Sequence, residues 1–102
     1  MLFKTYHVYI LKCSDDSYYI GVTNNIVRRM GEYENGQSVK AYTFLRRPLK
    51  LVYKKEFRNI LKAIAYEKQL KGWRRAKKEA LVEGRLKDLV GLAKSHGSTS
   101  SP

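Results

Sequence analysis

The apolar residues near the start of the chain fall into two short runs that predict a β-hairpin. The first run, residues 6–12, is apolar on both faces, as expected of a central strand. The second run, residues 17–22, returns as its partner, because Asp15 and Asp16 between the runs are typical of a turn. A hairpin built on a central strand is therefore the first element that the pattern predicts.

The register of this hairpin follows from the length of its loop. With a five-residue loop over residues 13–17, Tyr9 lies opposite Gly21 and Tyr19 lies opposite Leu11. The two phenols then project from the same face as diagonal neighbours, about 7–8 Å apart. Because Gly21 has no side chain, we expect space beside the phenols where a ligand approaches the sheet.

Helical and strand periodicities continue along the rest of the chain. They predict a helix over residues 26–34 capped by Asn24 or Asn25, a long loop, a half-exposed strand over residues 49–54, and a helix over residues 60–71 capped by Asn59. A short basic helix follows Trp73. The order β-β-α-β-α-α implies the fold class α/β (α+β), with a small three-stranded antiparallel sheet flanked by helices.

Length and composition indicate one domain. The 102 residues are 43% hydrophobic, which suits a globular chain with a single core. We expect this domain over residues 1–94, with its core at 4–84 and a C-terminal helix at 85–94. The Ser- and Gly-rich tail over residues 95–102 is predicted to be disordered.

The charge of the chain points to a polyanionic partner. Twenty-one Lys and Arg against nine Asp and Glu give a net charge of +12. A membrane surface is the competing partner, but no stretch approaches the ~18 apolar residues of a spanning helix, and the basic residues are scattered over the predicted elements. Nucleic acid is therefore favoured. The single cysteine, Cys13, and the lack of an apolar leader predict a cytoplasmic protein.

Glu67 is the most unusual single position. It follows Ala63 by four residues and Ile64 by three, so it falls on the apolar stripe of its helix. A carboxylate there requires a compensating cation, and Lys71 four residues on is the ordinary candidate. The alternative is a divalent metal: one carboxylate, several waters and a substrate phosphate together suit Mg²⁺.

Tyrosines and an arginine supply further candidate chemistry. Arg29 stands at the border of its helix's apolar stripe, whereas Arg28 points to solvent. For Tyr9 and Tyr19, the alternative to a catalytic role is simple packing, since the chain has eight tyrosines. A phenol with a pKa near 10 is also a poor base at neutral pH. A neighbouring cation or metal-bound water makes a catalytic role plausible.

A phosphate-binding surface is predicted from the remaining basic residues, although a solvated helix face is the ordinary explanation of such runs. The candidates are Arg28, Lys40, Arg46, Arg47, Lys71, Arg74, Arg75, Lys77 and Lys78.

Taken together, these motifs resemble the GIY-YIG nuclease superfamily, in particular its small stand-alone single-domain members. The resemblance covers roughly residues 4–84, and the motifs come in the family's order. They are His7-Val8-Tyr9, Tyr19-Ile20-Gly21, Asn24-Asn25-Ile26-Val27-Arg28-Arg29, and Tyr66-Glu67-Lys68-Gln69-Leu70-Lys71-Gly72-Trp73. Each motif alone is weak, and their common order makes the resemblance specific.

The resemblance implies a divalent-metal-dependent endonuclease, using Mg²⁺ or Mn²⁺, that hydrolyses DNA phosphodiester bonds, with DNA repair or recombination as a setting. It implies that Tyr19 acts as general base or orients the attacking water, that Tyr9 hydrogen-bonds nearby, that Arg29 neutralises the phosphate, and that Glu67 binds the metal. His7 and Tyr33 are expected to support the site.

Two departures from the family pattern bear on activity. The glycine of the first motif is His7, and a histidine common four residues after the helix arginine is Tyr33. The alternative function is therefore a catalytically weak or inactive nucleic-acid-binding module with the same fold. We expect DNA as the partner, with RNA left open, and neither a membrane nor a small-molecule cofactor; the oligomeric state stays open.

Overall fold

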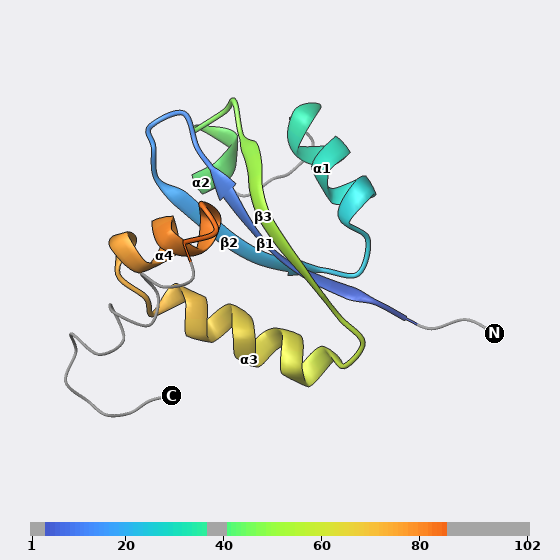
Figure 1. The fold of residues 1–102 in the computed structure, drawn as a ribbon. Helices are drawn as coiled ribbons and strands as arrows, with labels where there is room; N and C mark the ends of the chain where they lie inside the picture. Colours follow the sequence, from blue (N-terminus) through green and yellow to red (C-terminus); the bar gives the residue numbers. More distant parts are fainter. Residues whose placement is uncertain (1–3, 37–40, 86–102) are drawn as a thin grey trace. The chain divides into compact units, whose positions relative to one another are not determined.

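The computed structural model describes residues 4–36 and 41–85 of the chain (Figure 1). The chain divides into two compact units, Met1–Lys71 and Gly72–Pro102, and each is described by itself. The predicted C-terminal helix and tail lie outside the described residues, as does Lys40. The expectation of a single domain over residues 1–94 therefore stays a prediction.

The first unit is built on a three-stranded antiparallel sheet in the order β2-β1-β3. Its strands are β1 (Tyr6–Lys12), β2 (Tyr18–Thr23) and β3 (Lys50–Phe57). The central strand β1 is the most buried, which explains why its sequence is apolar on both faces. The predicted fold class, a small antiparallel sheet flanked by helices, is confirmed.

The predicted hairpin register is also confirmed. Tyr9 pairs with Gly21 and Leu11 pairs with Tyr19 across β1 and β2. Because side chains alternate between the faces of a strand, Tyr9 and Leu11 share one face of the sheet with Tyr19.

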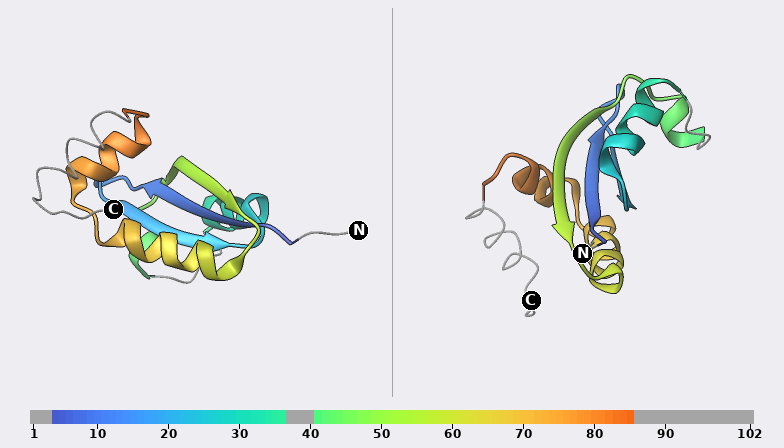
Figure 2. Two further views of the ribbon diagram at one scale, coloured as in Figure 1. Left: turned by 60° about the horizontal axis from the view of Figure 1, so that its bottom comes forward. Right: turned by 90° about the vertical axis from the view of Figure 1, so that its right-hand side faces the viewer.

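Two helices cover the two faces of this sheet, as Figure 1 shows. Helix α1 (Ile26–Glu34) lies on the face of Tyr9, where its Tyr33 contacts the Tyr9 ring. Helix α3 (Ile60–Lys71) lies on the other face, where its Tyr66 contacts Tyr53 and Phe57 of β3. The views in Figure 2 agree with this layered arrangement of the first unit.

Both helices begin at the asparagines that the sequence indicates. The side chain of Asn25 accepts a hydrogen bond from the Arg28 backbone N–H at 3.0 Å. The side chain of Asn59 accepts from the backbone N–H groups of Leu61 and Lys62 at 2.8 and 3.1 Å. Each cap satisfies donors that have no partner inside the first helical turn.

The predicted long loop is not wholly irregular, because it contains a one-turn helix, α2 (Ala41–Phe44). Its segment is tied to the β1–β2 hairpin, since the Ser14 backbone N–H donates to the Arg46 carbonyl at 3.0 Å. Strand β3 is longer than predicted, and an irregularity at Ile10/Leu11 interrupts its pairing with β1.

The second unit contains the predicted basic helix as α4 (Arg75–Val82). Within it, Arg75 Nε donates to Glu79 Oε2 at 2.9 Å, and Lys77 Nζ lies 4.2 Å from the centroid of a Trp73 ring. Over residues 4–36 and 41–85, no helix has the length and apolar character needed to span a bilayer.

Candidate active site

A pair of buried phenols forms the centre of the site. Tyr9 Oη and Tyr33 Oη lie 2.8 Å apart and share a hydrogen bond, and the two rings meet edge to face with centroids 6.2 Å apart. Tyr9 is 1% exposed and Tyr33 is 4% exposed. The tyrosine found at the usual histidine position therefore places its hydroxyl directly on the tyrosine of the first motif.

Gly21 is required by the Tyr9 ring rather than by a ligand. A Cβ atom on Gly21 would lie 2.5 Å from Tyr9 Oη and 2.7 Å from Tyr9 Cζ, distances that real Cβ contacts do not reach. The expected open space beside Gly21 was therefore wrong, because the Tyr9 side chain lies across it. The glycine lets the phenol extend over β2 toward Tyr33.

Tyr19 borders this pair on the same face but is more accessible. Its side chain is half-buried and packs against the cluster that contains Tyr9 and Tyr33. Its ring also contacts the ring of Tyr42 on α2, with centroids 5.9 Å apart. Of the phenols in this cluster, Tyr19 is the one that a solvent water reaches most readily.

Arg29 supplies the cation of the site. Its side chain is 29% exposed, and Nε lies 3.2 Å from Glu32 Oε1. That contact has ion-pair distance without hydrogen-bond geometry, so the buried Nε–H finds no hydrogen-bond acceptor in the described part of the chain. The guanidinium also interacts with Tyr9 and Tyr33. An unsatisfied donor beside two phenols is suited to an anionic ligand.

The pKa shifts separate the roles of these groups. Burial, together with the hydrogen bond to Tyr33, holds the pKa of Tyr9 far above its usual value. Burial likewise raises the pKa of Tyr33. Burial alone would lower the pKa of Arg29, but the neighbouring phenols and Glu32 outweigh it, so that pKa is raised. Tyr9 and Tyr33 therefore stay neutral hydrogen-bonding groups beside a permanently charged guanidinium.

Glu67 lies apart from these four residues, on the helix that packs against the other face of the sheet. Its side chain is 15% exposed, which matches the predicted place on the buried stripe, and Oε2 lies 3.2 Å from Lys71 Nζ. The ion pair that was the ordinary explanation of this carboxylate therefore exists. A cavity of about 240 Å³ lined by Arg29, Thr23 and Ile60 joins α1 to the start of α3.

The side chains of the site fit only a metal ion that has few protein ligands. Within residues 4–36 and 41–85, no three His, Cys, Asp or Glu side chains gather into a cage. A single carboxylate oxygen such as that of Glu67 still suits Mg²⁺, which retains several waters and uses substrate phosphate as a ligand. The competing Lys71 is 56% exposed, so it can leave the carboxylate at little cost.

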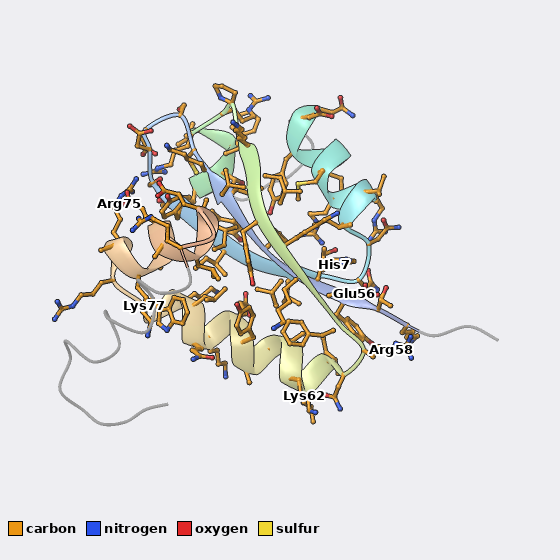
Figure 3. All side chains as sticks on the ribbon, in the orientation of Figure 1. His7, Glu56, Arg58, Lys62, Arg75 and Lys77 are labelled. Carbon is orange, nitrogen blue, oxygen red and sulfur yellow. The ribbon has the colours of Figure 1, made fainter. Side chains whose placement is uncertain are left out.

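His7 shares the face of Tyr9, as strand alternation predicts. It pairs with Thr23 on β2 and with Glu56 on β3, and Figure 3 shows His7 and Glu56 on these neighbouring strands. Its buried Nδ1 finds no hydrogen-bond partner among the described residues.

Several predicted phosphate-binding residues already have partners within the chain. Arg46 Nε donates to Asp15 Oδ2 at 2.9 Å, the Arg47 guanidinium lies 4.3 Å from the Phe44 ring centroid, and Arg28 Nε lies 3.8 Å from Glu32 Oε2. Sequence reasoning did not single out Tyr42, whose ring contacts the ring of Tyr19. Its contact with Tyr19 joins residues far apart in the chain, so no local pattern signals it.

Comparison with known proteins gives one consistent answer. The profile of the GIY-YIG catalytic domain matches residues 5–80. A UPF0213 protein of Natronomonas pharaonis is 40% identical over 77 residues, which cover 76% of this chain and 89% of the relative. A UPF0213 protein of Limosilactobacillus reuteri is 36% identical and covers 93% of this chain and 100% of the relative.

Two solution NMR structures are similar in fold. The UPF0213 protein BH0048 of Bacillus halodurans has 38% identity and a TM-score of 0.52, covering 78% of this chain and 83% of its own. The protein EF2693 of E. faecalis has 28% identity and a TM-score of 0.54, covering 97% of this chain and 94% of its own.

Proposed function

Because this chain belongs to the GIY-YIG catalytic domain family, a nuclease family, we propose that it is a divalent-metal-dependent endonuclease that hydrolyses DNA phosphodiester bonds. A role in DNA repair or recombination and a cytoplasmic location are part of this proposal.

The arrangement of Arg29 with three tyrosines carries the proposal. One guanidinium with a buried, unsatisfied Nε–H lies beside the hydrogen-bonded pair of Tyr9 and Tyr33, and the half-buried Tyr19 borders them. The charge of Arg29 is compensated in part by Glu32, whose Oε1 lies 3.2 Å from Arg29 Nε. The side chain is still 29% exposed, so a phosphate group would reach the accessible part of the guanidinium.

The proposed mechanism assigns one task to each group. Arg29 neutralises the charge that develops on the scissile phosphate. Tyr19 orients the attacking water or, as the phenolate, accepts its proton, because it is the accessible phenol. The neutral pair of Tyr9 and Tyr33 holds Arg29 and the site in place. Glu67 lies apart from these four residues, and only its place in the family motif assigns it the divalent ion. When bound, the ion would polarise the phosphoryl oxygens.

The net charge of +12 supports a nucleic-acid substrate. DNA is the proposed partner, and RNA is a competing substrate for the assay to separate. The main alternative function, a binding module without cleavage, is favoured by one observation: the ion pair between Glu67 and Lys71 occupies the carboxylate.

Cleavage of labelled linear, nicked, branched and single-stranded DNA, and of RNA, tests the proposal. Each substrate is incubated with purified protein in Mg²⁺, in Mn²⁺, and in a chelator. We expect metal-dependent cleavage that Glu67→Gln abolishes while DNA affinity is retained. The matched control is Glu83→Gln, which removes an exposed carboxylate paired with Arg85 in the second unit.

The two functions give opposite outcomes in this assay. Binding of DNA without cleavage of any substrate in either metal would establish the binding module instead. Full cleavage by a folded Glu67→Gln variant would show that Glu67 is not a metal ligand.

A further inference from the structure

We propose that Tyr42 is a positioning residue that holds Tyr19 in its catalytic orientation, an inference that rests on the proposed role of Tyr19 in DNA hydrolysis. Tyr42 stands on α2, outside the motifs of the sequence analysis, and it is 39% exposed. Its ring lies tilted by 31° against the Tyr19 ring, with centroids 5.9 Å apart. Aromatic pairs at this distance attract each other and restrict each other's orientation.

Tyr42 is itself held at both ends. At the hydroxyl end, Tyr42 Oη donates to Ser17 Oγ at 2.8 Å, two residues before Tyr19. At the ring, the Arg46 guanidinium lies 3.9 Å from the Tyr42 centroid, and Arg46 Nη1 donates to the Tyr42 carbonyl at 3.1 Å. A ring restrained in this way is a fixed support for its neighbour.

Asp15 closes these contacts into a ring. Its Oδ1 accepts hydrogen bonds from Ser17 Oγ at 2.6 Å and from the Ser17 backbone N–H at 3.0 Å. Its Oδ2 accepts from Arg46 Nε at 2.9 Å. The chain of contacts therefore runs from Tyr42 to Ser17, Asp15 and Arg46 and returns to Tyr42.

This ring of contacts links α2 to the hairpin. Every member is partly exposed, so its ion pair and hydrogen bonds contribute little to stability in water. Their geometric effect is larger, because together they fix one aromatic ring against the accessible phenol of the site. Tyr19 packs against the cluster of Tyr9 and Tyr33 and also contacts the Tyr42 ring, so Tyr42 adds a second restraint on its orientation.

Two variants test the proposal. Tyr42→Leu removes the aromatic ring and the hydroxyl, whereas Tyr42→Phe keeps the ring contact with Tyr19 and loses only the hydrogen bond to Ser17. The matched control is Tyr53→Phe, which loses a comparable 2.8 Å hydroxyl contact with Tyr66 on the opposite face of the sheet. All are assayed well below their melting temperatures.

The first measurement is kinetic. We expect the single-turnover cleavage rate of Tyr42→Leu to fall about 10–100-fold, the usual consequence of a displacement of about 1 Å in a catalytic group, with the Kd for DNA within about twofold. Tyr42→Phe should lose less, and Tyr53→Phe should match the wild type. If the Kd of Tyr42→Leu for DNA rises by the same factor as its cleavage rate falls, the proposal is overturned, because Tyr42 would then be a DNA contact.

The second measurement is independent of activity. In metal-free and DNA-free protein with ¹³C-labelled tyrosine rings, NMR relaxation reports the order of the Tyr19 ring. We expect that order to fall in Tyr42→Leu and to stay unchanged in Tyr53→Phe. Unchanged order in Tyr42→Leu would show that Tyr42 does not position Tyr19. If the wild type cleaves nothing, the proposed function fails, while this measurement still decides whether Tyr42 holds Tyr19.

Discussion

Replacement of Gly21 by alanine tests how closely Tyr9 packs on β2. The added Cβ would lie 2.5 Å from Tyr9 Oη and 3.2 Å from Tyr9 Cε1, and the phenol is buried, so it has to move. Overpacking of a core costs about 1–3 kcal/mol, and losing the hydrogen bond to Tyr33 costs about 1 kcal/mol. Alanine in a strand regains roughly 0.5–1 kcal/mol relative to glycine. The net loss of stability should be about 1–3.5 kcal/mol.

Urea unfolding followed by circular dichroism measures this cost, and a double-mutant cycle assigns it. The same Gly21→Ala change is made in a Tyr9→Leu background, which has no ring over β2. There we expect a neutral or slightly stabilising effect, which gives a coupling free energy of about 2 kcal/mol or more. An equal cost in both backgrounds would refute the packing explanation, since the glycine would then serve something other than Tyr9.

Two further predictions concern pH and salt. The pKa of Tyr9 is raised in the folded protein, so its contribution to stability should be full below about pH 10. Above that pH only the unfolded chain loses the proton, and the free energy of unfolding should decline. Urea unfolding midpoints should show that Tyr9→Phe flattens this decline by up to about 1.4 kcal/mol per pH unit. Affinity for duplex DNA should fall as salt rises, with a slope of roughly −4 to −7 on a log–log plot. Binding titrations should show a flatter slope when four basic residues are replaced together. An unaffected slope would show that these four residues form a solvated helix face and do not contact phosphates. The four residues are Arg74, Arg75, Lys77 and Lys78.

The hairpin and the helix starts could be predicted because their causes are local. Strand alternation and a five-residue loop are enough to set Tyr9 against Gly21. Asn25 and Asn59 cap their helices through side-chain contacts within three residues along the chain. These interactions need no knowledge of the tertiary structure.

The parts that sequence reasoning missed depend on distant contacts. Tyr33 is 24 residues from Tyr9 in the sequence, and Arg46 is 31 residues from Asp15, so neither hydrogen bond leaves a periodic signal in the sequence. The space beside Gly21 was misjudged for a similar reason, because strand alternation gives the face of Tyr9 but not the direction in which its ring leans. The short helix α2 has only four residues, too few for a periodic pattern.

Glu67 is the opposite case: its burial could be predicted locally, but its partner could not. The apolar spacing around it predicts a largely buried carboxylate, and the side chain is 15% exposed. The spacing does not distinguish between Lys71 and a metal as its partner, because both compensate the charge. Its assignment as a metal ligand remains a prediction for the Glu67→Gln assay.

The most direct test of the proposed mechanism is the single-turnover rate of DNA cleavage by Tyr19→Phe, measured in Mg²⁺ beside the wild type. The substitution removes one hydroxyl from the accessible phenol and leaves its ring packed against Tyr42. We expect a rate about 10²–10⁴-fold lower, the usual contribution of a proton-transfer group, with the Kd for DNA nearly unchanged. A rate equal to that of the wild type, or a loss confined to DNA binding, would contradict the proposed role of Tyr19.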